Sequence, residues 1–110
     1  MTVVAARVRE IVVVHDVSCP RCSRIAHELP GCVTVPVRPR SCSEPRLAEI
    51  YPNLPTAVAR CARPAIGVVR IDGSVRWWQG LAGAVGLLPV LRPGAGARAV
   101  GLLREAARGR

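Results

Sequence analysis

Hydrophobic positions along the chain form two kinds of run, which predict strands and helices in alternation. Residues 8–15 are nearly continuous and β-branched, which is typical of a central strand covered on both faces. Residues 20–29 carry apolar side chains at helical spacing, and Pro30-Gly31 ends that run. The first half of the chain therefore predicts a buried strand followed directly by a helix.

The next segments are shorter. Alternating valines over residues 32–37 predict a second strand, and residues 38–41 are expected to form a loop. A short helix is predicted from Ser43 to about Tyr51. Residues 56–63 fit either a helical turn or an irregular connection.

A β-hairpin is the clearest signal in the second half. Residues 64–71 and 75–78 predict two strands, joined by Asp72-Gly73, a dipeptide typical of tight hairpin turns. Residues 80–91 then predict a helix, although it contains three residues that weaken helices by about 1 kcal/mol or more each, namely Gly83, Gly86 and Pro89.

The last amphipathic segment, residues 98–108, is expected to bury Val100, Leu103 and Ala107. The resulting order is that of the thioredoxin fold: an α/β protein whose central mixed sheet of about four strands is flanked by helices, with an extra C-terminal helix. We expect one domain, with a core over about residues 8–91 and a helical extension over about 94–108.

Composition narrows the possible partners. Half of the 110 residues are hydrophobic, Phe is absent, and all sixteen basic residues are arginines, which leaves a net charge of +9. Such a charge can serve nucleic-acid binding, but here the arginines are scattered singly and form no long basic face. Nucleic acid is therefore a disfavoured partner.

The expected location is the cytoplasm. Charged residues interrupt the N-terminal apolar stretch, so no secretory signal is apparent, and the longest apolar segment, residues 81–91, is too short for a transmembrane helix. Cysteine pairs in that compartment are more often catalytic or metal-binding than structural. The five cysteines cannot all pair internally.

The chemistry concentrates in Cys19-Pro20-Arg21-Cys22, at the junction of the first strand and helix. A Cys19 at the helix N-cap would face unpaired backbone N–H groups and the positive end of the helix dipole, which favour its nucleophilic thiolate. Cys22 would lie within one helical turn, close enough to form a disulfide with Cys19. Pro20 suits the first helical position. Arg21 and Arg24 are expected to add positive charge near both sulfurs.

Residues 16–24, which begin with Asp16 and contain both cysteines, resemble the Asp-x-x-Cys-x-x-Cys signature of the DCC family of predicted thiol–disulfide oxidoreductases. Residues 66–78 and 81–93 are similar to the family's later strand–turn–strand and its Leu- and Pro-rich helix. Val17 stands where that family usually has glycine.

The broader thioredoxin superfamily carries a cis-proline before the third strand, where it shapes the substrate groove. Pro64 lies at the matching position, and a cis bond there would strengthen the resemblance. The residue that follows, Ala65, replaces the threonine often found there.

Other side chains have simpler explanations. Asp16 is expected to cap the turn before the helix rather than to steer a proton near Cys19. Of the remaining cysteines, Cys32 is expected in the core and Cys61 as a buried apolar residue or an accessory thiol near the dithiol, whereas Cys42 is expected in a loop, open to solvent. Both histidines are expected to be structural.

Trp77 and Trp78 should lie on opposite faces of their strand, one ring inward and the other exposed, with packing by the C-terminal helix preferred over a partner or membrane contact.

The sequence thus predicts a thiol–disulfide oxidoreductase in which Cys19 is the nucleophile and Cys22 resolves the mixed disulfide, supported by Pro20, Arg21, Asp16 and Pro64. It should act on protein or low-molecular-weight disulfides and thiols and need no organic cofactor, with electrons supplied by a reductase or glutathione. Two alternatives stay open. The same dithiol could bind a soft metal such as copper or zinc, although no second Cys-x-x-Cys exists, or the thiols could be incidental to a basic interaction domain.

Overall fold

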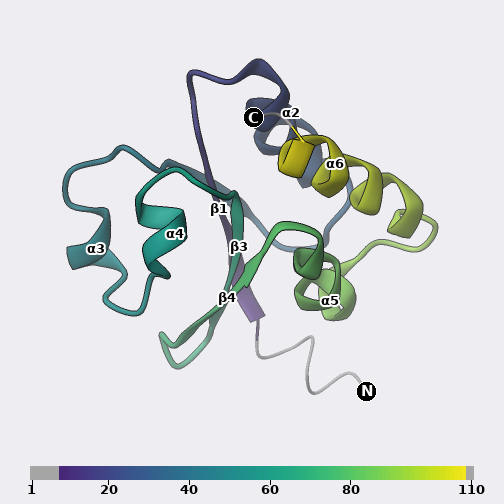
Figure 1. Cartoon of the computed structure of the whole chain (residues 1–110). Coiled ribbons are helices and arrows are strands. Elements are labelled where there is room, and N and C mark those ends of the chain that lie inside the picture. The colour runs from purple at the N-terminus through teal and green to yellow at the C-terminus, as the bar shows by residue number, and fades with distance from the viewer. Residues whose placement is uncertain (1–7, 109–110) are drawn as a thin grey trace.

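The computed structural model describes residues 8–108, except for the side chains of Arg21 and Cys22 (Figure 1). Its strands are β1 (Val8–His15), β2 (Val37–Ser41), β3 (Ala65–Arg70) and β4 (Val75–Gln79). Its α-helices are α2 (Pro20–Glu28), α3 (Leu47–Ile50), α4 (Thr56–Ala59), α5 (Gly83–Leu87) and α6 (Gly96–Arg108). Single 3₁₀ turns occupy η1 (Leu29–Gly31), η2 (Gly80–Ala82) and η3 (Leu88–Val90).

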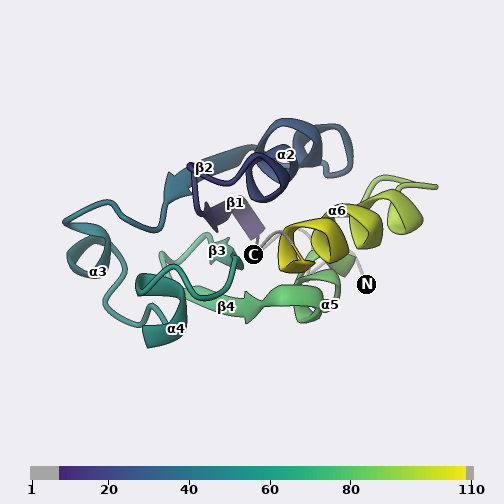
Figure 2. The same ribbon diagram turned by 45° about the horizontal axis from the view of Figure 1, so that its top comes forward.

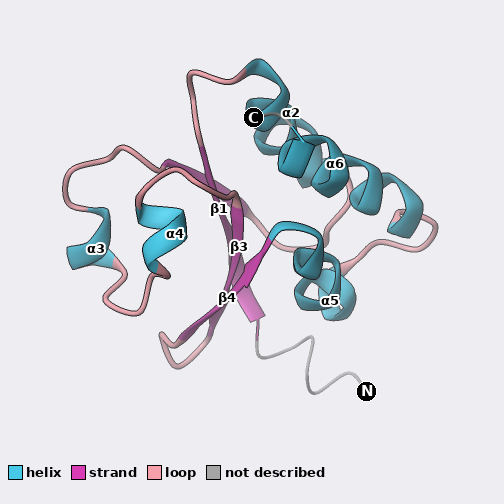
Figure 3. Cartoon of the chain, in the orientation of Figure 1, coloured by secondary structure: helices cyan, strands magenta, loops and turns pink. Residues whose placement is uncertain are grey.

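The four strands, magenta in Figure 3, form one mixed sheet in the order β2-β1-β3-β4. β1 runs parallel to β2, so the crossover between them, which contains α2, returns the chain to the same end of the sheet. β3 runs antiparallel to β1 and to β4. The protein is therefore an α/β protein with a mixed four-stranded sheet, as the sequence predicted.

Helices cover both faces of this sheet (Figures 1 and 2). On one face, α2, α5 and α6 pack against β1 and β3 around a buried cluster that includes Ile11, Val13, Ile25, Leu29, Ile66, Leu87 and Leu103. On the other face, the segment with α3 and α4 packs a smaller cluster that includes Val12, Val14, Leu47, Tyr51, Val58 and Val69. β1 contributes alternate residues to both clusters, which explains its continuous apolar sequence.

Three predicted elements are confirmed. β1 spans residues 8–15, α2 begins at Pro20, and the β3–β4 hairpin turns at Asp72-Gly73. The Asp72 Oδ1 accepts hydrogen bonds from the Ser74 backbone N–H at 2.9 Å and from its hydroxyl at 2.7 Å, and Gly73 adopts φ +89°. Few side chains other than glycine tolerate that φ, so the turn follows from these residues alone.

The second strand was predicted in the wrong place. β2 spans Val37–Ser41, whereas the alternating residues 32–36 lie outside the sheet. Among them, Val33 forms an isolated bridge to Leu91. β2 is an edge strand, so Pro39 can occupy it with its missing donor on the unpaired side. The expected loop is thus a strand because β1 provides the partner.

The helix predicted over residues 80–91 is broken into η2, α5 and η3. Its glycines are needed for close packing: a β-carbon on Gly83 would lie 2.8 Å from Ile66 Cγ1, and one on Gly86 would overlap the Trp78 indole. The buried face of α6 also differs from the prediction, since it carries Ala99, Leu102, Leu103 and Ala106. These residues join the core cluster on the α2 side, so α6 is part of the core rather than an extension of it.

The two tryptophans do lie on opposite faces, but neither ring is fully exposed. The Trp77 indole Nε1 donates to Asn53 Oδ1 at 3.1 Å, and its ring meets Tyr51 edge-on at a centroid distance of 5.3 Å. Trp78 packs against α5 beneath the Arg76 guanidinium, 4.6 Å from its ring centroid. Both rings therefore serve packing, Trp77 against Tyr51 and Trp78 against α5.

Candidate functional site

Cys19 lies directly before α2, at the end of the sheet where β1 terminates. Its carbonyl accepts a hydrogen bond from the Ser23 N–H at 3.0 Å, and its own N–H donates to the Asp16 carbonyl at 3.1 Å. This is the backbone pattern of an N-cap residue. Cys19 is half-buried. The Cys22 backbone belongs to the first turn of α2, while the side chains of Cys22 and Arg21 lie outside the described part of the structure.

Asp16 stabilises the turn that leads to Cys19. One carboxylate oxygen, Oδ1, accepts the Ser18 backbone N–H at 3.0 Å and the Ser18 hydroxyl at 2.6 Å. The result is an Asx-turn, in which a side chain replaces a backbone acceptor. This is the contact expected of a turn-capping aspartate, and it fixes the path of the chain into the helix.

Arg24, which was expected to add positive charge near both sulfurs, is engaged in ion pairs. It forms ion pairs with Glu28 and, at 3.0 Å, with Glu105 of α6, while Glu28 also pairs with Arg98 of α6 at 3.2 Å. The hydrogen bonds from Arg24 and then Arg98 lower the pKa of Glu28. Arg24 therefore links α2 to α6, and its charge is balanced by two carboxylates.

His15, the last residue of β1, is buried with 6% of its surface exposed. Burial is the main cause that lowers its pKa, so the imidazole is neutral at pH 7. Its Nδ1 lies 3.4 Å from the Ser23 hydroxyl of α2. The side chain thus connects the sheet to the helix that follows Cys19. This is the structural role expected of it.

Pro64 lies immediately before β3, at the same end of the sheet. Its carbonyl accepts the Gly80 N–H at 3.1 Å, and Pro64 and Ile25 of α2 border the same apolar gap, which is too narrow to hold a water molecule. The described residues contain no cis peptide bond, so the bond before Pro64 is trans. Pro64 therefore lacks the cis bond that would have strengthened its resemblance to the groove proline of the thioredoxin superfamily.

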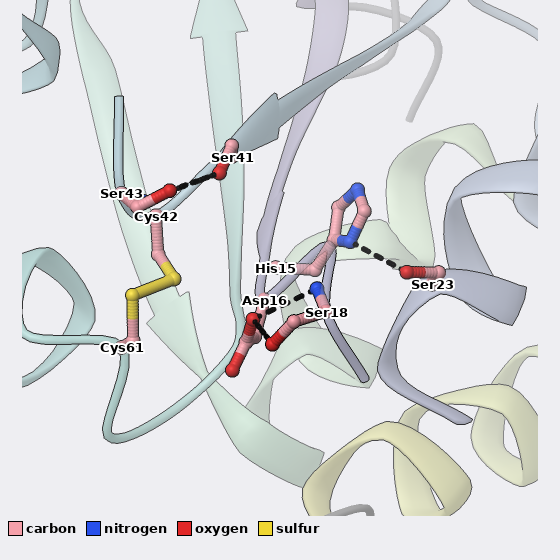
Figure 4. Close-up of a disulfide and its surroundings, with 8 residues drawn as sticks. All are labelled: His15, Asp16, Ser18, Ser23, Ser41, Cys42, Ser43 and Cys61. Atoms are coloured by element: carbon pink, nitrogen blue, oxygen red, sulfur yellow. Dashed lines mark hydrogen bonds between the residues drawn. A yellow bond between two sulfur atoms is a disulfide. The ribbon is translucent and has the colours of Figure 1, made fainter. Parts of the chain in front are cut away.

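A disulfide joins Cys42 to Cys61, with a Cα–Cα distance of 5.3 Å (Figure 4). The expectation of an exposed Cys42 is wrong, because Cys42 is 4% exposed and packs in the smaller cluster beside α3 and α4. Cys61 is its disulfide partner rather than an accessory thiol. Cys61 adopts φ +60°, the left-handed region that residues with a β-carbon rarely occupy. Nothing in the spacing of these two cysteines indicated the pairing, which depends on how the chain returns to the sheet.

Cys32 is fully buried in the other cluster, as predicted. Among the described side chains, no group of three or more His, Cys, Asp or Glu residues is arranged to hold a metal ion. None of the helices within residues 8–108 is long and apolar enough to cross a membrane.

The site and the sheet together define an α/β protein with a Cys-x-x-Cys segment at a strand–helix junction. No protein-family model matches the chain, and neither the curated proteins nor the solved structures include a match to it. Membership of the DCC family and of the thioredoxin superfamily therefore stays a prediction from the residues.

Proposed function

We propose that this protein is a thiol–disulfide oxidoreductase whose redox pair is Cys19 and Cys22. One observation carries the proposal: Cys19 is the N-cap residue of α2, a nine-residue helix that follows the central strand. Unpaired N–H groups and the helix dipole at such a position stabilise a thiolate, which is the attacking species in disulfide exchange.

The order and directions of the strands support the same proposal. A parallel β1–β2 pair with α2 in its crossover, followed by an antiparallel hairpin, is the arrangement expected of a thioredoxin-like fold, with the dithiol at the first helix. In the proposed reaction, the Cys19 thiolate attacks the disulfide of a protein or small molecule, and one substrate thiolate leaves. Cys22 then attacks the Cys19 sulfur of the mixed disulfide, which releases the second substrate thiolate and leaves Cys19 and Cys22 joined by a disulfide. A cytoplasmic location, with glutathione or a reductase as electron source, completes the proposal.

The test is the midpoint potential of the Cys19–Cys22 pair. Purified full-length protein is equilibrated in glutathione buffers of graded ratio, quenched with acid and alkylated. Trypsin cleaves between Arg21 and Cys22, so the two cysteines fall on different peptides and a disulfide between them is identified directly.

We expect the Cys19–Cys22 pair to show one two-electron transition. It should be absent in Cys19→Ser and in Cys22→Ser but present in Cys32→Ala, which removes only a buried core thiol. If no disulfide links Cys19 and Cys22 at any ratio, the proposal is wrong. Copper or zinc retained in stoichiometric amount would then favour the soft-metal alternative, and steeply salt-dependent nucleic-acid binding would favour the basic interaction domain.

A further inference from the structure

Three segments that carry cysteines meet at one end of the sheet. The backbone N–H of Cys42 donates to the His15 carbonyl at 3.0 Å, and that of Cys19 donates to the Asp16 carbonyl at 3.1 Å. Cys42 and Cys19 are thus anchored to two consecutive residues of the chain. Cys61 is joined to Cys42 by the disulfide.

The segment after Cys61 leads towards the first helix. Three residues later the chain reaches Pro64, which borders a narrow apolar gap together with Ile25 of α2, one helical turn beyond Cys22. In Figure 4 the disulfide lies beside the turn formed by His15, Asp16 and Ser18, the residue before Cys19. Both cysteine pairs therefore belong to one edge of the molecule, although they are far apart in sequence.

We propose that the Cys42–Cys61 disulfide is a second redox couple that exchanges electrons with the Cys19–Cys22 dithiol inside the same molecule. This inference rests on the proposed function. Cys61 is the partly exposed member of the disulfide and Cys42 the buried one, so attack is expected at the Cys61 sulfur.

The exchange is balanced without any other reactant. The Cys19 thiolate attacks the Cys61 sulfur, the Cys42–Cys61 bond breaks, and Cys42 leaves as a thiolate. The Cys22 thiolate then attacks the Cys19 sulfur of the Cys19–Cys61 mixed disulfide, and Cys61 leaves as a thiolate. Two electrons pass from the dithiol to the disulfide, and the leaving thiolates take up the protons that the attacking thiols lost.

The φ of +60° at Cys61 belongs to the end of α4 and does not depend on the disulfide. There the Cys61 N–H donates to the Val58 carbonyl at 3.0 Å and the Ala62 N–H to the Ala57 carbonyl at 2.9 Å, the pattern of a helix that ends in a left-handed residue. The expected location of the protein suits the proposed role. In the cytoplasm, where we expect this protein, disulfides are usually transient, catalytic or redox-sensing rather than structural. Reduction and reformation of the Cys42–Cys61 bond would thus form part of the working cycle.

The first experiment measures how fast glutathione opens the Cys42–Cys61 disulfide in the full-length protein. The wild type is compared with Cys19→Ser, which keeps a good N-cap residue, and with Cys32→Ala as the matched control at a buried thiol. Because the internal dithiol acts at high effective concentration, we expect opening to slow about tenfold or more in Cys19→Ser and to stay unchanged in Cys32→Ala. An unchanged rate in Cys19→Ser overturns the inference.

The second experiment traps the intermediate. In Cys22→Ser, the mixed disulfide cannot be resolved, so a peptide that contains Cys19 should be found linked to the one that contains Cys61, with Cys42 alkylated. Trypsin cleaves after arginine except before proline, and so places each of the five cysteines on its own peptide, which makes the assignment unambiguous. Absence of any Cys19 link to Cys61 or Cys42 overturns the inference.

Failure of the inference differs from failure of the proposed function. The midpoint of the Cys19–Cys22 pair is measured in a Cys42→Ala/Cys61→Ala variant, where no second couple exists. A defined midpoint there, together with an unchanged opening rate in Cys19→Ser, retains the oxidoreductase and rejects the internal exchange. Absence of a Cys19–Cys22 disulfide in both proteins rejects the two proposals together.

Discussion

The Cys42–Cys61 link should stabilise the folded protein by about 3 kcal/mol. The two cysteines are separated by 19 residues in sequence, and a disulfide that closes a loop of this length removes about that much chain entropy, as free energy at 25 °C, from the unfolded state. The closed loop contains Leu47, Tyr51 and Val58, the residues that cover the second face of the sheet. Opening the link therefore makes this part of the core harder to assemble.

Urea unfolding of oxidised wild-type protein, reduced wild-type protein and the Cys42→Ala/Cys61→Ala variant measures this effect. We expect the oxidised protein to exceed both others by about 3 kcal/mol, which corresponds to a change in melting temperature on the order of 15 °C for a domain of this size. The two unlinked forms should nearly agree, because the truncated side chains are small.

A difference below about 1 kcal/mol between oxidised and reduced wild type would refute the entropic argument, since the loop would then already be constrained in the unfolded chain. Amide hydrogen exchange gives an independent check. In the reduced protein, the α3–α4 segment should exchange faster while β1 and β3 stay protected.

Two further changes test the packing and the electrostatics. Gly67→Ala should destabilise the folded protein by about 1–3 kcal/mol, because the new β-carbon would lie 2.6 Å from Trp77 Cζ3. Gly101→Ala, on the open surface of α6, should instead stabilise it by up to about 1 kcal/mol. Equal effects of the two substitutions in thermal unfolding would disprove this account. Burial lowers the pKa of His15, so below about pH 6.5 the unfolded chain binds a proton that the folded chain does not, and stability should fall as the pH drops from about 7 towards 5. Denaturant unfolding across that range should show that the free energy of unfolding declines less in His15→Gln than in the wild type. His27→Gln, a control on the exposed surface of α2, should decline as the wild type does. The same decline in the wild type and both variants would contradict a buried neutral His15.

Local signals in the sequence determined the elements whose structure depends on near neighbours. The β-branched run of residues 8–15 forms a strand wherever it is buried on both faces, and Asp72-Gly73 closes a hairpin through contacts within the turn itself. Asp16 caps its turn in the same way, and Pro20 begins α2 because its own ring sets the helical φ. The position of Cys19 at a helix start could be predicted for this reason.

Contacts between distant segments decided the rest. The residues of β2 form a strand because they pair with β1 at the edge of the sheet. Arg24 forms an ion pair with α6 because Glu105 lies within its reach. Cys42 and Cys61 form a disulfide because two loops return to the same end of the sheet. None of these pairs is close in sequence, so no local pattern of apolar or charged residues encodes them. The sequence by itself located one cysteine pair, and only the tertiary structure brought a second pair to the same edge.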